Sequence, residues 1–123
     1  MIQERSILKV ADNSGAKTVR CFRILGGSKR RYARLGDVVI ASVQTAEPRK
    51  QVKKKDIVNV VVVRQKEATR RKDGSYVRFS DNAVVLIDKD KKEPNATRIF
   101  GPIPREIKER GYDTIASLAE ELV

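Results

Sequence analysis

The side chains in this sequence that are best suited to chemistry are cations, and they gather in three clusters. The clusters cover residues 29–34, residues 49–55 and residues 64–78. Long cationic side chains in loops and at strand ends reach away from a rigid scaffold, where phosphate pairing and counterion release would dominate their affinity for a polyanion. We therefore predict that the binding residues are Lys17 and the cluster members Lys29, Arg30, Arg31, Tyr32, Arg34, Arg49, Lys50, Lys53, Lys54, Lys55, Arg64, Lys66, Arg70, Arg71, Lys72 and Arg78.

The positive charge is unevenly distributed along the chain. The 123 residues contain 27 Lys and Arg against 16 Asp and Glu, a formal net charge of +11. Residues 1–80 hold 20 basic and 7 acidic side chains, whereas residues 81–123 hold 7 basic and 9 acidic ones. Such a surplus suits a polyanion, an anionic membrane or merely a soluble basic surface. We disfavour a membrane as a partner because no amphipathic basic helix accompanies the charge.

Catalytic chemistry has little support in the sequence. There is no His for general acid–base work, no GxSxG turn and no GxxxxGK[ST] phosphate loop. The lone Cys21 cannot form an intramolecular disulfide or complete a usual zinc site. A magnesium-dependent nuclease remains a distant alternative, although its candidate carboxylates each lie beside a turn or strand end: Asp12, Asp37, Asp56 and Asp73. We expect no enzyme activity, no cofactor and no metal site.

The chain has no sequence feature of a membrane-spanning or secreted protein. Its longest uninterrupted apolar run, Ala83–Ile87, is far shorter than the roughly 20 residues of a membrane span. Glu4 and Arg5 stand where a secretory signal would begin its apolar region. We expect a soluble, cytoplasmic protein.

The kind of polyanion is indicated by what the basic region lacks. No helix long enough to read a DNA groove is expected there, and irregular basic loops suit folded RNA. The sequence has three Tyr, three Phe and no Trp. Tyr32 and Tyr76 could stack on bases, whereas Phe79 is expected in the core. We therefore favour a binder of structured RNA, with a free-standing barrel that binds single strands as the alternative.

The apolar pattern is that of short strands separated by turns. Branched and aromatic residues concentrate in six segments, and turn-forming residues such as Asp12-Asn13-Ser14-Gly15 and Asp73-Gly74 lie between them. Strands this short form small sheets with costly free edges, which favours closure. We predict a mainly β fold, a five- to six-stranded barrel with strands at Ile7–Val10, Thr18–Leu25, Val38–Val43, Ile57–Val63, Tyr76–Phe79 and Ala83–Ile87.

The pattern changes to a helical period near the C-terminus. Pro104 and Gly111 are placed to begin and end a helix over Arg105–Arg110. A second helix, capped by Asp113 or Thr114, would carry an apolar stripe of Ile115, Leu118, Ala119 and Leu122. The stripe should pack on the barrel, with a partner surface as the alternative. We expect one domain over 1–123, a barrel over 1–103 with a hairpin arm near 64–79, and short helices over 104–123.

Short motifs along the whole chain follow the order seen in a known family. They are Ala11-Asp12-Asn13-Ser14-Gly15-Ala16, Leu25-Gly26-Gly27, Arg31-Tyr32-Ala33, Gly36-Asp37-Val38, Val61-Val62-Val63-Arg64, Arg70-Arg71-Lys72-Asp73-Gly74-Ser75, Arg78-Phe79, Asp81-Asn82-Ala83, Thr97-Arg98-Ile99-Phe100-Gly101-Pro102 and Ser117-Leu118-Ala119. Together they closely resemble the large-subunit ribosomal protein L-fourteen family, in its bacterial form.

The resemblance implies a fold, a function and partners. It implies a five-stranded barrel with a protruding hairpin and small C-terminal helices, bound to 23S rRNA as a structural part of the large ribosomal subunit in the cytoplasm. It further implies a place at the subunit interface, beside the L-nineteen and L-three proteins and near 16S rRNA in an intersubunit bridge. A ribosome-silencing factor docks on bacterial members, and we carry that protein interface over to Thr97, Arg98 and Phe100.

Three positions depart from the family pattern. Lys55 stands where the family usually has Gly before an acidic residue, and Asn95-Ala96 stands where a Gly normally precedes Thr97. Val60 replaces a usual Ala or Gly, which is most simply a packing change. None of the three removes a basic cluster.

Overall fold

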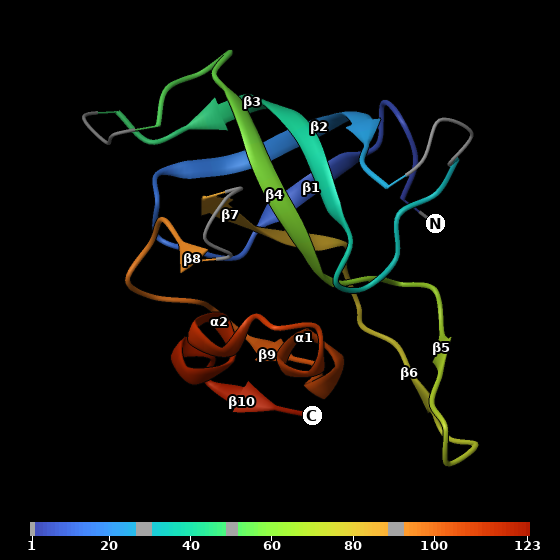
Figure 1. The fold of residues 1–123 in the computed structure, drawn as a ribbon. Helices are drawn as coiled ribbons and strands as arrows, with labels where there is room; N and C mark the ends of the chain where they lie inside the picture. The colour runs from blue at the N-terminus through green and yellow to red at the C-terminus, as the bar shows by residue number, and fades with distance from the viewer. Residues whose placement is uncertain (1, 27–30, 49–51, 89–92) are drawn as a thin grey trace.

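The computed structural model describes residues 2–26, 31–48, 52–88 and 93–123. Its centre is a closed barrel in which the strands pair in the order β1-β2-β3-β4-β7 and a parallel pairing of β7 with β1 completes the ring (Figure 1). These strands are β1 (Ile7–Val10), β2 (Ala16–Ile24), β3 (Val38–Ala46), β4 (Ile57–Arg64) and β7 (Ala83–Asp88). The predicted mainly β barrel is confirmed. Four predicted binding residues lie outside the described part of the chain: Lys29, Arg30, Arg49 and Lys50.

Strands β4 and β7 are continuous apolar runs because both of their faces are covered. Alternate side chains of a strand point to opposite faces. One set of side chains from β4 and β7 points into the barrel and packs there against Leu8, Val19 and Val39. The members of this set are Val60, Val62, Val84 and Leu86. The other set, Val61, Val63, Val85 and Ile87, packs outside the barrel against Ile99, Ile103, Ile107 and Ile115. The C-terminal segment is therefore held by a second apolar core.

The remaining strands are short and lie outside the barrel ring. A separate two-stranded sheet, β5 (Thr69–Arg70) with β6 (Tyr76–Val77), forms a hairpin arm that projects away from the barrel (Figure 1). The predicted strand Tyr76–Phe79 is therefore shorter than expected and belongs to this arm. Strand β8 (Glu93–Pro94) extends the barrel sheet beside β7, and β9 (Pro102–Ile103) pairs in parallel with β10 (Glu121–Leu122).

Two short helices, α1 (Arg105–Glu109) and α2 (Asp113–Leu118), lie on one side of the barrel (Figure 1). Pro104 is the residue before α1, and Gly111 follows it with a φ of 94°, a conformation that favours glycine. In the described part of the chain, no helix has the length and apolar content to cross a membrane.

The second helix differs from its prediction at both ends. Its N-cap is Tyr112, which makes no side-chain cap hydrogen bond and is buried in the second core, so the predicted cap at Asp113 or Thr114 is wrong. The helix ends at Leu118 because Ala119 is extended and leads into β10. Ile115 is buried on the helix as expected, whereas Leu122 lies on β10 and is 38% exposed. The helical stripe is therefore shorter than the sequence indicates.

Lys55 adopts a backbone conformation that is costly for any residue with a Cβ. Its φ is 74°, in the left-handed region, at the turn that leads from residues 53–54 into β4. We predict that Lys55→Gly raises the free energy of unfolding by about 1 kcal/mol, because glycine has no such penalty. Urea denaturation would measure the change. Lys54→Gly, at a neighbouring position without a positive φ, should give no stabilisation, and an equal effect of the two changes would contradict this explanation.

Candidate nucleic-acid interface

The hairpin arm presents most of the third cationic cluster to solvent. Lys66, Arg70, Lys72 and Arg78 are all exposed. At the tip, Asp73 Oδ1 accepts hydrogen bonds from the backbone N–H and the hydroxyl of Ser75, at 3.0 and 2.6 Å, and these bonds lower the pKa of Asp73. The arm is thus a short, locally fixed hairpin with long cations along its length.

Asn82 fixes the place where the arm leaves the barrel. Its Oδ1 accepts a hydrogen bond from the Lys66 backbone N–H at 2.9 Å, and its carbonyl accepts one from the Lys9 N–H at 3.0 Å. Asn82 therefore joins the base of the arm, which its side chain contacts, to β1, which its backbone contacts.

Arg71 takes a different role from its neighbours on the arm. Its Nε and Nη2 donate to the Glu106 carboxylate on α1, at 2.6 and 3.2 Å, and Nη2 also donates to the Val123 carbonyl at 2.7 Å. The Arg71 and Glu106 side chains are only 15% and 25% exposed. A bidentate, half-buried pair of this kind holds the arm against the C-terminal segment. Arg71 was predicted to bind RNA, and the structure instead places its guanidinium within the protein.

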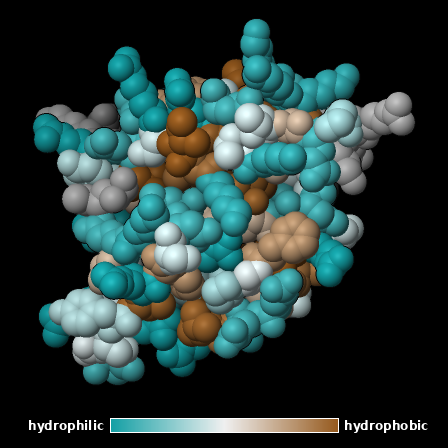
Figure 2. Space-filling model, turned by 180° about the vertical axis from the view of Figure 1, so that it is seen from behind, coloured by the Kyte–Doolittle hydropathy of each residue, from teal (hydrophilic) through white to brown (hydrophobic). Residues whose placement is uncertain are grey.

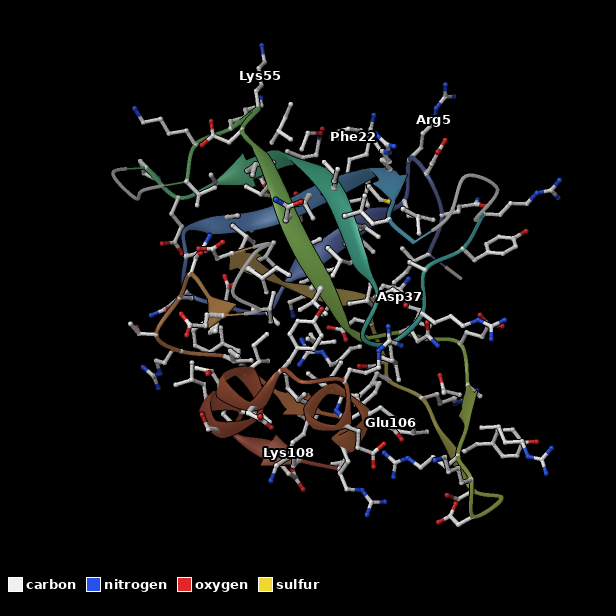
Figure 3. The ribbon with its side chains drawn as sticks, viewed as in Figure 1. Arg5, Phe22, Asp37, Lys55, Glu106 and Lys108 are labelled. Carbon is white, nitrogen blue, oxygen red and sulfur yellow. The ribbon has the colours of Figure 1, made fainter. Side chains whose placement is uncertain are left out.

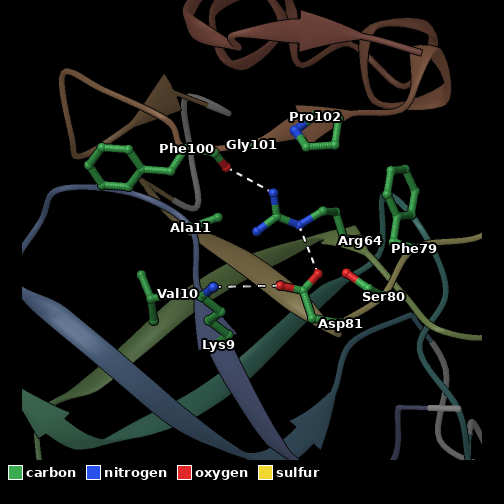
Figure 4. A pocket seen from close by; sticks show the side chains of 10 residues that line it. All are labelled: Lys9, Val10, Ala11, Arg64, Phe79, Ser80, Asp81, Phe100, Gly101 and Pro102. Carbon is green, nitrogen blue, oxygen red and sulfur yellow. Dashed lines mark hydrogen bonds and ion pairs between the residues drawn. The ribbon is translucent and has the colours of Figure 1, made fainter.

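Arg64 is also turned inward, at the wall of a pocket of about 390 Å³ (Figure 4). Its side chain is 7% exposed, and its Nη1 donates to the Phe100 carbonyl at 2.9 Å. Its Nε lies 3.1 Å from Asp81 Oδ1, an ion pair without the alignment of a hydrogen bond. Lys9 lies on the other side of Asp81, at 3.8 Å. Arg64 therefore joins β4 to the segment after Ile99, and its guanidinium is largely enclosed by the protein.

Asp37 fixes the backbone beside the first cluster. Its Oδ2 accepts a hydrogen bond from the Arg34 N–H at 2.7 Å, and its Oδ1 accepts one from Arg110, the residue that follows α1, at 3.2 Å. The carboxylate is buried, while the Arg31, Tyr32 and Arg34 side chains are exposed. The structure therefore presents this part of the cluster on an ordered turn.

Lys17 and the described cations of the second cluster, Lys53, Lys54 and Lys55, are likewise exposed. Asp56 Oδ2 accepts a hydrogen bond from the Lys53 N–H at 2.9 Å, and the Lys55 N–H donates to the Val43 carbonyl at 2.8 Å. Lys53, Lys54 and Lys55 therefore project from a fixed turn. Lys55 lies at the end of the barrel far from α1 and α2, whereas the arm projects on the side of the helices (Figures 1 and 3). The described cations of the clusters accordingly lie at separate places on the surface rather than in one patch.

The four carboxylates considered for a nuclease each serve a local structural purpose. Asp37, Asp56 and Asp73 accept hydrogen bonds within their own turns, as described above. Asp12 Oδ1 accepts from the Ser14 N–H and hydroxyl, and its Oδ2 accepts from the Leu86 N–H at 3.0 Å. Burial raises the pKa of Asp12. Among the residues that the structure describes, no three His, Cys, Asp or Glu side chains come together as a metal site.

The predicted protein interface is a fixed block at the surface. Asn13 Oδ1 accepts hydrogen bonds from the backbone N–H groups of Thr97 and Arg98, both at 3.1 Å, and Asn13 Nδ2 donates to Thr97 Oγ1 at 3.2 Å. The Phe100 N–H donates to the Ala11 carbonyl. The Arg98 guanidinium lies 5.8 Å from the centre of the Phe100 ring, which is 43% exposed. An exposed aromatic and a cation are thus held on a rigid backbone. The sequence had marked Asn13 only as a turn residue.

The exposure of the aromatic residues agrees in part with what the sequence predicted. Tyr32 and Tyr76 are 39% and 67% exposed, so their rings are accessible for contact. Phe79 is only partly buried and lines the Arg64 pocket, although it was expected in the core. Three arginines that the sequence did not single out are exposed on the barrel or beside it: Arg5, Arg20 and Arg23. The signal for Arg20 and Arg23 was the polar alternation within Thr18–Leu25, because neither belongs to a run of cations in a loop.

A comparison with protein families identifies the chain. The family model described as Ribosomal protein L14p/L23e matches residues 1–123. Members of this family are structural proteins of the large ribosomal subunit that bind rRNA, and the family is not one of enzymes. The separate cationic contact points and the barrel that carries them agree with that function. The chain belongs to the ribosomal protein L14p/L23e family.

Proposed function

We propose that the chain is a structural constituent of the bacterial large ribosomal subunit and binds 23S rRNA through its exposed cations. The observation that carries this proposal is the hairpin arm, where Arg70, Lys72 and Arg78 are exposed and make no ion pair within the described residues. Lysines 53–55 and the exposed arginines of residues 31–34 would add contacts at the barrel end. Separate contact points suit folded RNA, because several helices can be held at fixed distances by one rigid protein.

The proposal extends to the subunit interface. The fixed Thr97–Phe100 block offers an aromatic ring and an arginine on a rigid backbone, and such residues dominate binding energy at protein interfaces. It would serve as the docking surface of a ribosome-silencing factor. The neighbouring C-terminal segment has little net charge, which suits contacts with the proteins L-nineteen and L-three. The same side would meet 16S rRNA in an intersubunit bridge.

If the chain binds rRNA through its cations, the affinity should depend steeply on salt concentration. Each phosphate neutralised on single-stranded regions contributes about −0.7 to the slope of log affinity against log salt, so that roughly ten contacts give a slope near −7. Filter binding of the full chain to large-subunit rRNA at several salt concentrations would measure it. A slope close to zero would contradict binding through the phosphate backbone.

The docking surface can be tested separately from RNA binding. Subunits that carry Arg98→Glu should bind the silencing factor at least tenfold more weakly, because the cation beside Phe100 is replaced by an anion. Their content of this chain should stay normal, which serves as the internal control. Undiminished factor binding to such subunits would contradict the assignment of Thr97, Arg98 and Phe100.

A further inference from the structure

The outer face of β2 carries one aromatic side chain, Phe22, among polar and charged ones. The pairing of β2 with β3 shifts register between Cys21 and Arg23, so Phe22 is an extra residue in the strand. A bulge of this type re-aims side chains, and Phe22 and Arg23 both point to solvent. Phe22 is 44% exposed. The bulge therefore places the Phe22 ring and the Arg23 side chain side by side on the barrel surface.

Arginines surround this ring. Arg20 is two residues before Phe22 on β2 and is exposed. The Arg5 N–H donates to the Cys21 carbonyl at 2.6 Å, which brings Arg5 beside Phe22, and Figure 3 shows the two side chains near each other at the same edge of the barrel. Within the described residues, neither Arg5 nor Arg20 nor Arg23 makes an ion pair.

The backbone of Arg5 is held in an unfavourable conformation. Its φ is 72°, in the left-handed region that residues with a Cβ seldom adopt. Strain of this kind persists where the surrounding structure imposes it, and it concentrates at functional positions. At Arg5 the unfavourable backbone conformation occurs together with the hydrogen bond that fixes this residue beside β2.

The arginine-rich face continues into the first cationic cluster. Ile2 pairs with Ala33, whose N–H donates to the Ile2 carbonyl at 2.8 Å, so residues 2–5 lie between β2 and the segment that carries Tyr32. A shallow depression of about 280 Å³ is lined by Gln3, Glu4, Arg31 and Tyr32. Two exposed rings, Phe22 and Tyr32, are therefore set among arginines on neighbouring parts of one surface.

We propose that Arg5, Arg20, Phe22 and Arg23 form a nucleotide-binding site, the β2-face site, for an unpaired nucleotide of RNA. The base stacks on the Phe22 ring, and the flanking phosphates pair with Arg5 and Arg20. Base stacking on an aromatic ring and pairing of arginine with phosphate are the interactions that proteins use for unpaired RNA. This inference rests on the proposed function, because it assigns a further contact to the same rRNA.

An RNA occupant fits this surface better than a protein one. The exposed apolar side chains of the face do not form a continuous patch, because Arg20 and Ser42 lie between Ile7 and Ile57 in the strand register. Seen from behind, the molecule likewise has no continuous apolar surface: Figure 2 shows small groups of hydrophobic residues among hydrophilic ones. A protein interface needs a larger apolar centre, whereas one ring among unpaired cations matches a base and its phosphates.

Site-specific crosslinking tests the assignment in the assembled subunit. A benzophenone amino acid would replace Phe22, and a control chain would carry it in place of Leu122 on β10, which is 38% exposed. Irradiation of purified large subunits should join position 22 to RNA, in a product that ribonuclease degrades, while position 122 gives no RNA product of comparable yield. A crosslink from position 22 only to protein, or none in subunits that contain the chain, would overturn the proposal.

A second measurement applies to the full chain in solution. Phe22→Leu and Arg20→Gln should each weaken binding to large-subunit rRNA about tenfold. The matched controls are Leu122→Ala on β10 (Figure 1) and Lys108→Gln on α1, which lies far from Phe22 (Figure 3). Both should change binding less than about twofold. Unchanged affinity of both site variants would overturn the β2-face site alone. Failure of the wild-type chain to bind rRNA would instead overturn the proposed function.

Discussion

Reversal of charge at Arg70, Lys72 and Arg78 should prevent the chain from entering large ribosomal subunits. The three side chains are exposed on the hairpin arm. Hydrogen bonds to charged groups contribute about 1.5–3 kcal/mol each. Loss of three such contacts therefore weakens binding by roughly a thousandfold or more, and the added carboxylates repel phosphates. The triple glutamate variant should remain at the top of a sucrose gradient when it is expressed beside the wild-type chain.

The design of this variant depends on leaving Arg71 unchanged. Because Arg71 pairs with Glu106 and the Val123 carbonyl, its replacement would also release the arm from α1. The triple variant should keep the thermal unfolding midpoint of the wild type within a few degrees, since exposed charges contribute little to stability. A control reversal at Glu121, an exposed residue of β10, should leave incorporation unaffected. Normal incorporation of a folded triple variant would show that the arm is not an RNA contact.

Replacement of Gly101 by alanine should strongly destabilise the fold. Gly101 has a φ of 81°, and a Cβ there would overlap the buried Arg64 guanidinium. Relief of the overlap would require Arg64 to leave the Phe100 carbonyl and Asp81, which would strand a buried charge. We expect a loss of about 3–4 kcal/mol in the free energy of unfolding, measured by urea denaturation.

Gly74 supplies the matched control for Gly101. Its φ is 89°, so an alanine there meets the same backbone penalty, but an added Cβ would have no heavy atom within 4 Å. Gly74→Ala should therefore cost only about 1–2 kcal/mol. The difference between the two variants measures the contact with Arg64. Equal losses would show that backbone conformation alone explains both, and that the Arg64 position is readily changed.

The barrel was predictable because its signals are local. Short runs of branched residues between turn-forming residues give strands, and the run Val60–Val63 indicates a strand with no solvent-facing side. The sequence predicted that the helical stripe with Ile115 packs on the barrel, but it did not indicate that Ile103 and Ile107 cover the outer face with it. That covering depends on Ile103, Ile107 and Ile115, which are distant in the chain.

Long-range pairing determines where two of the predicted binding residues lie. Arg64 and Arg71 belong to runs of cations that look exposed in the sequence. Their positions depend on Asp81 and Glu106, and Glu106 is 35 residues from Arg71. A charge run does not show which of its members meets an acidic group, so the buried and the exposed cations could not be told apart.

The surface around Phe22 was missed for a different reason. Strict alternation along β2 would place Phe22 on one face and both Cys21 and Arg23 on the other. The bulge instead exposes Phe22 and Arg23 together, and its position depends on pairing with β3. A similar dependence ends α2 at Leu118, because the next residues pair with β9 rather than continue the helix.

Sedimentation of the chain with the large ribosomal subunit tests the central claim most directly. Cells that express a tagged copy of the chain would be lysed, and the ribosomal subunits would be washed in moderate salt and separated on a sucrose gradient. Binding to rRNA through several separate cationic contact points predicts that the chain stays in the large-subunit fraction, in a constant ratio to the rRNA. Recovery of the chain only in the soluble fraction, with none in the large-subunit peak, would contradict it.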